Sequence, residues 1–494
     1  MTDRRDYPGT MMPERPRRLI DPGRPHLIAG AFLFAASLAL FWPGYAEYDT
    51  LRQYEQVVAN QVDDWHPPIM ARLWQVLLPL GHGTAPLLVL QLAGYWLGLA
   101  LIADALAAAG RARAGWATLM VGLLPPLLGW QVVVLKDAQL VGATLAATGL
   151  IARYRLHGRP VPLGVIAIAG LLFGYALLVR ANAVFALAPL IVALSPLRRA
   201  GARLGATLAI VAAVLASSGP INRRVLGAQP SDVATTQARY DLAGIAVRTD
   251  ASVAGLAPGT GAALRAGHCV TPYFWDPLED TPACAAALAP LATSSTGTLY
   301  RRLAVEAFRH PPAYVTHRAA HLNMTWRWLV PARLPGAEPP TISEPNAEGI
   351  ATPGRVAAAW QMLAGRVTRG PLGWPFVWIV AALLLLPAAR RAQGGAARRL
   401  ALGLLASALA LEASFAAVSI AADLRYHLWP ILATALAAVL LIERAPSRRA
   451  MCVVAGAVLF LGAPALLARM TFADPPQEYD DLLRWTPPVT LLPR

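Results

Sequence analysis

The sequence predicts an all-helical polytopic membrane protein with about eleven transmembrane helices and a mostly helical extracytoplasmic domain. The chain of 494 residues is 56% hydrophobic and only 14% charged, too few charged groups to cover a soluble globule of this size. Long apolar runs recur along most of the chain, and short clusters of arginine separate them. These features together make a lipid bilayer the expected solvent.

The expected spans are the apolar runs that approach the roughly 20 residues needed to cross the hydrocarbon. They lie at 26–44, 84–108, 115–134, 138–153, 161–179, 183–197, 204–219, 373–389, 399–421, 428–443 and 451–469. The chain then divides into a basic tail over 1–25, helices one to seven over 26–219 with a first outer loop at 45–83, an outer domain over 220–372, helices eight to eleven over 373–469, and an outer tail over 470–494.

Basic residues indicate the orientation of these spans. One set of segments carries 21 of the 42 arginines, in the N-terminal tail and at 111–113, 153–159, 198–203, 390–399 and 444–449. The short loops of the other side carry only Arg52, Arg72, Lys136, Arg180 and Arg425. Because loops rich in Lys and Arg stay inside, the N-terminus is expected in the cytoplasm and residues 220–372 outside it. The net charge of +15 follows this topology and forms no continuous basic face, so nucleic acid is not an expected partner.

The outer domain contains two of the three cysteines. Cys269 and Cys284 lie in this polar region, whereas Cys452 lies in an apolar run. An extracytoplasmic compartment permits disulfides, so a bond between Cys269 and Cys284 is expected.

Ionisable residues near the membrane surface gather in the short outer loops. These loops hold Asp49, Asp64 and His66, then Lys136, then Arg180, and finally Arg425 with Tyr426. Charged groups at membrane depth are costly and are usually functional. Lys136 is the one lysine among 43 Lys and Arg residues, which favours a need for a compact ammonium group. Cations beside acids suit an anionic lipid headgroup and a reaction that needs a base.

Short motifs in these loops resemble the GT-C superfamily of integral-membrane glycosyltransferases, and especially its branch similar to protein O-mannosyltransferases. The motifs are Trp42–Thr50, Asp63–Pro68, Leu135–Asp137, Val179–Asn182, Arg309–Tyr314 and Leu424–Tyr426. The resemblance covers most of the chain in topology and rests on these motifs in residues. One departure is Asp49-Thr50, where that branch shows an Asp-Glu pair. Mannose as the sugar and protein as the acceptor therefore stay open.

The resemblance implies a polyprenyl-phosphate-linked sugar donor and a cell-envelope glycan, lipid or protein as acceptor, at the periplasmic face of a bacterial inner membrane. It also implies that Asp49 is the catalytic base. The chemistry is consistent with this, because a carboxylate can take the proton of an attacking hydroxyl and cations can stabilise a leaving phosphate. We expect Lys136, Arg180, Arg425, His66, Asp64 and Tyr426 to bind substrate, and a single displacement to invert the anomeric centre.

Other interpretations stay open at this point. Asp49 or Thr50 could cap a helix over 51–62, with Thr50 and Gln53 as a capping box. Lys136 could be an interfacial cation paired with Asp137, and Glu412 could pair with a buried arginine inside its span. A divalent metal is neither required nor excluded, since no tight ligand spacing is present. At the level of function, the alternatives are an oligosaccharide ligase or polymerase with a lipid-diphosphate donor, and a transporter.

Overall fold

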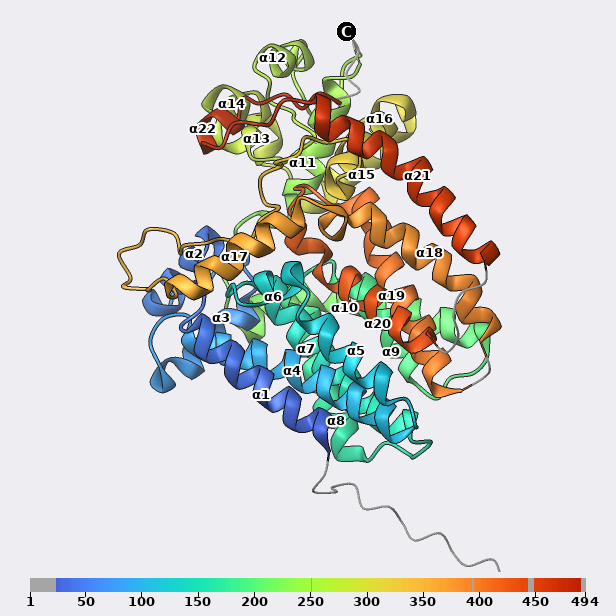
Figure 1. Cartoon of the computed structure of the whole chain (residues 1–494). Helices are drawn as coiled ribbons and strands as arrows, with labels where there is room; N and C mark the ends of the chain where they lie inside the picture. The colour runs from blue at the N-terminus through green and yellow to red at the C-terminus, as the bar shows by residue number, and fades with distance from the viewer. Residues whose placement is uncertain (1–23, 250, 393–394, 443–447, 490–494) are drawn as a thin grey trace, which may run out of the picture.

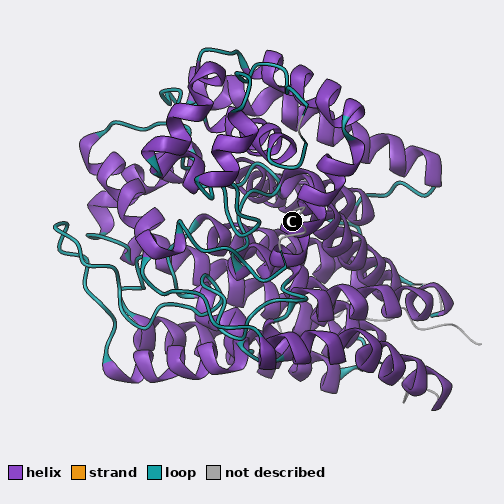
Figure 2. Ribbon diagram, turned by 90° about the horizontal axis from the view of Figure 1, so that it is seen from above, coloured by secondary structure: helices purple, strands orange, loops and turns teal. Residues whose placement is uncertain are grey.

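The computed structural model describes residues 24–249, 251–392, 395–442 and 448–489, and in these residues it is all helical (Figure 1). Helices make up 71% of it, no strand forms in the described segments, and only isolated bridges join extended residues (Figure 2). The basic tail predicted over 1–25 lies almost wholly outside the described residues.

The helices follow the apolar runs of the sequence. The N-terminal part contains α1 (Pro25–Phe41), α2 (Tyr48–Ala59), α3 (Pro68–Leu77), α4 (Ala85–Ala108), α5 (Ala112–Gly122), α6 (Pro125–Gln131), α7 (Lys136–Leu156), α8 (Leu163–Val179), α9 (Ala183–Leu194) and α10 (Ala200–Pro220). The outer region contains α11 (Val233–Ala246), α12 (Thr260–Ala266), α13 (Pro277–Asp280), α14 (Pro282–Ala292), α15 (Thr296–Arg309), α16 (Pro311–Trp326) and α17 (Arg355–Thr368). The C-terminal part contains α18 (Pro375–Arg391), α19 (Ala396–Val418), α20 (Leu428–Leu441), α21 (Arg448–Thr471) and α22 (Tyr479–Leu482). Short turns of other helix types lie at Leu78–Leu80 (η1), Ile221–Val225 (η2), Pro371–Gly373 (η3) and Leu424–His427 (η4).

Four helical stretches are long and apolar enough to cross a bilayer. They are Ala85–Ala108, Ala200–Val225, Ala396–Val418 and Leu424–Leu441, and shorter apolar helices accompany them. This agrees with a helical membrane protein, while the larger number of spans stays a prediction. The run expected as one span over 115–134 is instead two helices, α5 and α6. Pro125 and Pro126 follow the end of α5, and proline starts a helix more readily than it continues one.

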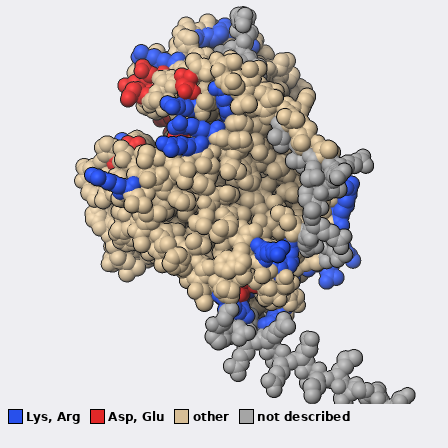
Figure 3. Space-filling model, viewed as in Figure 1, with Lys and Arg blue, Asp and Glu red and all other residues tan. Residues whose placement is uncertain are grey.

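The loops that were predicted to share a side of the membrane do meet in space. At the end of the bundle where α1 begins, Asp104 pairs with Arg24 at 2.7 Å and with Arg153 at 3.6 Å. Arg111 donates to the carbonyl oxygen of Leu440 at 2.9 Å, near the end of α20. The face drawn in Figure 3 is tan over the middle of the bundle, and charged groups gather above and below it. A belt without charged side chains between two charged ends is what a bilayer requires.

Glycines allow the central helices α4 and α7 to approach closely. A Cβ added at Gly142 in α7 would lie 2.6 Å from the carbonyl oxygen of Gln91 in α4, and one at Gly94 would lie 2.7 Å from the carbonyl oxygen of Gly142. Small residues at helix interfaces give membrane helices the van der Waals contact that the lipid does not provide. The two helices therefore form a tight centre for the bundle.

The outer region, predicted as one domain over 220–372, has two parts. Residues 233–326 have their own buried cluster, which includes Tyr240, Leu264 and Leu299, and a disulfide joins Cys269 and Cys284 as expected. The segment that follows lies on the bundle instead. Ala357 in α17 belongs to the main core, and Gln361 donates to the carbonyl oxygen of Gly129 in α6 at 3.0 Å.

A buried arginine joins the first of these parts to the bundle. Arg318 in α16 donates to the carbonyl oxygens of Phe415, Ala416 and Ser419, at 3.0, 2.8 and 2.9 Å. Two of these carbonyls lie in the last turn of α19, where helix geometry leaves them without partners and a cation is favourable. Asp241 in α11 balances the charge of Arg318 at 3.0 Å. The outer region thus fixes the chain where it leaves α19 toward Arg425.

Candidate functional site

The first outer loop is held against the segment that leads into α7. The backbone N–H of Tyr45 donates to Val132, and that of Val134 donates back to Tyr45, at 3.1 and 2.9 Å. The hydroxyl of Thr50 donates to the carbonyl oxygen of Val134 at 2.8 Å. These bonds place the first turn of α2 beside the first turn of α7, so Asp49 and Lys136 come together.

The capping box differs from the one expected. Glu47 is the N-cap residue of α2, and its backbone N–H donates to the hydroxyl of Thr50 at 3.1 Å. Gln53 donates instead to the carbonyl oxygen of Pro67 at 3.0 Å. The prediction that Asp49 or Thr50 caps the helix with Gln53 was therefore wrong by two or three residues, because the helix begins at Tyr48. The carboxylate of Asp49 is left for other contacts.

Asp49 lies between two cations. Its Oδ2 is 3.3 Å from Nζ of Lys136 and 3.0 Å from a guanidinium nitrogen of Arg425. Burial alone would raise the pKa of Asp49, but Lys136 and Arg425 outweigh it and hold that pKa well below its usual range. The group is therefore ionised, and about a fifth of its side chain stays exposed.

Arg425 connects several acids in this cluster. Its guanidinium is 3.2 Å from Glu47, 3.1 Å from Asp423 and 3.9 Å from Asp137. The turn η4 presents Arg425, and Gly336 supports that turn. Gly336 has a φ of +65°, accepts the N–H of Leu424 at 2.8 Å, and lies so close to Asp423 that a Cβ would collide with its carboxylate.

A second, more buried group of side chains, made of Arg180, Asp137 and Tyr426, adjoins Arg425. Arg180 forms an ion pair with Asp137, and its guanidinium lies 4.1 Å from the ring centre of Tyr426. The other carboxylate oxygen of Asp137 has no hydrogen-bond partner among the described residues. The structure thus brings Lys136, Arg180, Arg425 and Tyr426 together with Asp49, although the outer loops that carry them are far apart in the sequence.

His66 also belongs to the cluster, whereas Asp64 does not. His66 is buried, and this burial, together with Lys136, lowers its pKa to about 4, so it is neutral at physiological pH. Asp64 turns toward the outer region, where it accepts the backbone N–H and the hydroxyl of Ser231, both at 2.7 Å. Its geometry is that of an anchor between the first loop and the residues before α11.

Glu47 is the residue of this cluster that sequence reasoning missed. Burial raises its pKa to about 8, so its carboxyl carries a proton at neutral pH beside the ionised Asp49. The sequence signal that could have identified Glu47 was its position two residues before Asp49. The sequence does not reveal its burial, because Ser343 and Glu344 contribute to it: they bond to the backbone of Ala46 at 3.2 and 2.9 Å.

Glu412 has a different partner from the one expected. No arginine pairs with it in the described residues; Nδ1 of His427 lies 2.8 Å from its Oε1. The expected arginine partner was therefore wrong. The physical reason is that η4 turns the chain back over α19, so that His427 faces Glu412 while Arg425 faces the outer loops.

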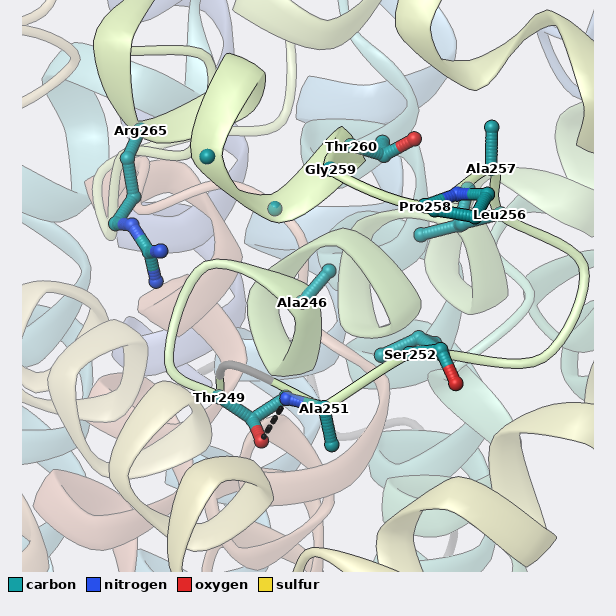
Figure 4. A pocket seen from close by; sticks show the side chains of 13 residues that line it. Ala246, Thr249, Ala251, Ser252, Leu256, Ala257, Pro258, Gly259, Thr260 and Arg265 are labelled. Carbon is teal, nitrogen blue, oxygen red and sulfur yellow. Dashed lines mark hydrogen bonds between the residues drawn. The ribbon is translucent and has the colours of Figure 1, made fainter.

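A surface hollow in the outer region lies away from this cluster and has no chemistry of this kind. It measures about 250 Å³ and lies between the end of α11, the residues that follow it and α12 (Figure 4). Its lining contains Thr249, Ser252, Thr260 and Arg265 but none of the predicted site residues. No group of three or more His, Cys, Asp or Glu side chains that could hold a metal ion occurs in the described part of the chain.

Comparison of the chain with protein-family models, with curated proteins and with solved structures gives no match.

Proposed function

We propose that the protein is a membrane glycosyltransferase that moves a sugar from a polyprenyl-phosphate-linked donor to an extracytoplasmic cell-envelope acceptor. The observation that carries the proposal is the position of Asp49, an ionised carboxylate held by Lys136 and Arg425 at the outer end of the bundle. The surroundings combine an accessible base, cations for a leaving phosphate and an apolar belt for a lipid chain.

The cations suit a phosphate ester whose charge grows as the bond to the sugar breaks. Lys136 and Arg425 are each within 3.3 Å of the carboxylate of Asp49, so a lipid phosphate at this position would be reached by both. Interactions that strengthen as negative charge develops lower the barrier. Arg180 lies one layer deeper, beside Asp137, where it reinforces the positive field of the site.

Donor binding would also activate the base. In the structure, Lys136 and Arg425 hold the pKa of Asp49 low, and a carboxylate in that state is a weak proton acceptor. A phosphate that takes over these two cations withdraws them from Asp49, and its own charge raises that pKa further. The acceptor hydroxyl then loses its proton to Asp49 while its oxygen attacks the anomeric carbon, and the lipid phosphate leaves from the opposite face. This single displacement inverts the anomeric centre.

The test is transfer by purified protein reconstituted in lipid, with three donors compared. We expect product from a polyprenyl-phosphate sugar and none from a soluble nucleotide sugar. Efficient transfer from the nucleotide sugar alone would overturn the proposal. Transfer of a whole oligosaccharide from a lipid diphosphate would identify a ligase or polymerase, and passage of the donor across the bilayer without product would identify a transporter.

A further inference from the structure

Two tryptophans meet where the first outer loop touches the outer region. Trp65 lies between α2 and α3, Trp275 lies just before α13, and their ring centres are 5.7 Å apart at an angle of 41°. Trp65 is 36% exposed and Trp275 is half-buried. In the view of Figure 3, a hollow separates the part with α13 and α22 from the part with α2 and α17, and charged groups line its rim.

Both indoles stand on fixed backbone. The backbone N–H of Trp65 donates to the carboxylate of Asp63 at 2.9 Å. The backbone N–H of Asp64 donates to the carbonyl oxygen of Gln229, also at 2.9 Å. On the other side, Phe274 forms an antiparallel bridge with Ala421. A binding surface that is already ordered loses little freedom when a ligand arrives.

The pair also adjoins the ion cluster on both sides. His66 follows Trp65 directly and lies within electrostatic range of Asp49 and Lys136. Ala421 precedes Asp423 by two residues, so the bridge sets Trp275 and Asp276 near that acid. Burial raises the pKa of Asp276 to about 7, and the charges of Asp280 and Asp423 add to the rise, which places Asp276 within electrostatic range of the cluster.

The chemistry of this place fits a sugar ring. Indole faces attract the weakly positive C–H groups of a pyranose or furanose. Hydroxyl groups need partners, and Asp276 offers a carboxyl. Tyr479, which is 48% exposed, offers a phenol oxygen that lies 3.3 Å from Asp276 and donates its hydrogen to the nearer Asp280. A lipid chain here would cover these polar groups with hydrocarbon and offer them no hydrogen bond in place of water.

We propose that Trp65, Trp275 and Asp276 form a subsite for a carbohydrate acceptor beside the ion cluster. This inference rests on the proposed function and narrows it, because it selects a glycan from the acceptor classes left open. The hydroxyl that attacks belongs to a sugar residue at Asp49, and a neighbouring sugar of the same glycan stacks on the two indoles.

The experiment measures saccharide binding to purified protein in detergent, by indole fluorescence and calorimetry, without any donor. The probes are hexasaccharides of glucose, mannose, galactose and arabinose, and a serine- and threonine-rich peptide. We expect at least one hexasaccharide to bind. Trp65→Ala and Trp275→Ala should each weaken that binding about three- to tenfold, and Trp65→Phe should restore part of it. Trp116→Ala removes an indole of similar exposure from α5 and should leave the saccharide affinity unchanged.

Several results would overturn the subsite. One is the absence of binding by every saccharide, and another is binding that both tryptophan variants leave unchanged while thermal stability falls, which is the behaviour of a purely structural contact. Stronger indole-dependent binding of the peptide would assign the place to a protein acceptor. The saccharide assay contains no donor, so its result does not depend on a phosphate bound at Lys136 and Arg425. A failure of donor transfer in the same preparation can therefore be told apart from a failure of the subsite.

Discussion

At the scale of single residues, the cluster contains carboxyl groups in opposite states of protonation. Glu47 and Asp49 lie two positions apart at the start of α2, yet burial raises the pKa of one to about 8 while two cations depress that of the other. Pairs of this kind are a means of assigning separate acid and base roles. Variants of Glu47 and of Asp49 should therefore have different effects on binding and turnover.

The first prediction concerns Asp49 and Lys136 in the proposed reaction. Asp49→Asn keeps the shape of the side chain and removes the base, so turnover should fall by about a hundredfold or more. Donor affinity should be kept or increase, because the neutral Asn no longer competes with the phosphate for Lys136 and Arg425. Lys136→Ala should weaken donor binding and slow transfer, and Lys136→Arg should recover only part of both, since a planar guanidinium differs in shape from an ammonium. Donor affinity and single-turnover rates check this on protein of normal thermal stability. Near-normal turnover in Asp49→Asn would remove Asp49 from the chemistry.

The second prediction concerns pH and Glu47. Its carboxyl is protonated below about pH 8 and gains a negative charge above that pH, beside the Arg425 that would hold the phosphate. Affinity for a polyprenyl phosphate should therefore decrease as the pH rises from 7 to 9. Glu47→Gln, which stays neutral, should bind with the same affinity at both values. Titration of the lipid into both proteins measures this, and an equal loss of affinity in the variant would point to a different group.

At the scale of elements, the apolar pattern predicts most helices because lipid selects for hydrophobic length, and α4, α8 and α19 lie close to their expected ranges. Two features did not follow from that pattern. The break between α5 and α6 depends on Pro125 and Pro126 in a run that stays apolar throughout. The partner of Glu412 depends on the path of η4, since hydropathy does not tell which residues of separate helices meet.

The same limit applies to the site. Single loops were enough to nominate Asp49, Lys136, Arg180 and Arg425, because charged residues in short outer loops are rare in this chain. The sequence did not predict which of these loop residues enter the cluster and which anchor the loop. Asp64 bonds to Ser231 and His66 enters the cluster, although both stand in the same short motif, because their side chains leave the loop in different directions.

The third prediction concerns packing between elements. Gly142→Ala would place a methyl group 2.6 Å from a backbone carbonyl oxygen of α4. Because that atom belongs to the backbone, the clash can be relieved only if α4 and α7 move apart. We expect a loss of about 1–3 kcal/mol of stability, seen as a lower melting temperature in detergent. Gly170→Ala is the matched control: it lies in α8, nothing lies within 4 Å of the added methyl group, and alanine favours the helix. Equal melting temperatures for the two variants would contradict the close α4–α7 contact.

At the scale of the whole molecule, the proposed mechanism requires that all its parts face the same side of the membrane. The bundle meets this requirement in its contacts. Asp49, Lys136, Arg180 and Arg425 meet at the end that carries the outer region. Of the arginines expected in the cytoplasm, Arg24 and Arg153 meet Asp104, and Arg111 meets the end of α20. A single inverted helix pair would have separated one of these sets.

The last prediction tests that orientation in cells. Fusions after residue 300, in α15, should activate a reporter that needs the periplasm, and fusions after residue 158, between α7 and α8, should activate one that needs the cytoplasm. Each position should carry both reporters, so that low expression is not mistaken for the opposite topology. The contacts agree with the grouping of loops that the positive-inside rule predicts, because Arg153 of the inner set holds Asp104 just before residue 158. A cytoplasmic signal at residue 300 would place Asp49 and its cations inside the cell, and a donor displayed on the outer leaflet could then not reach them.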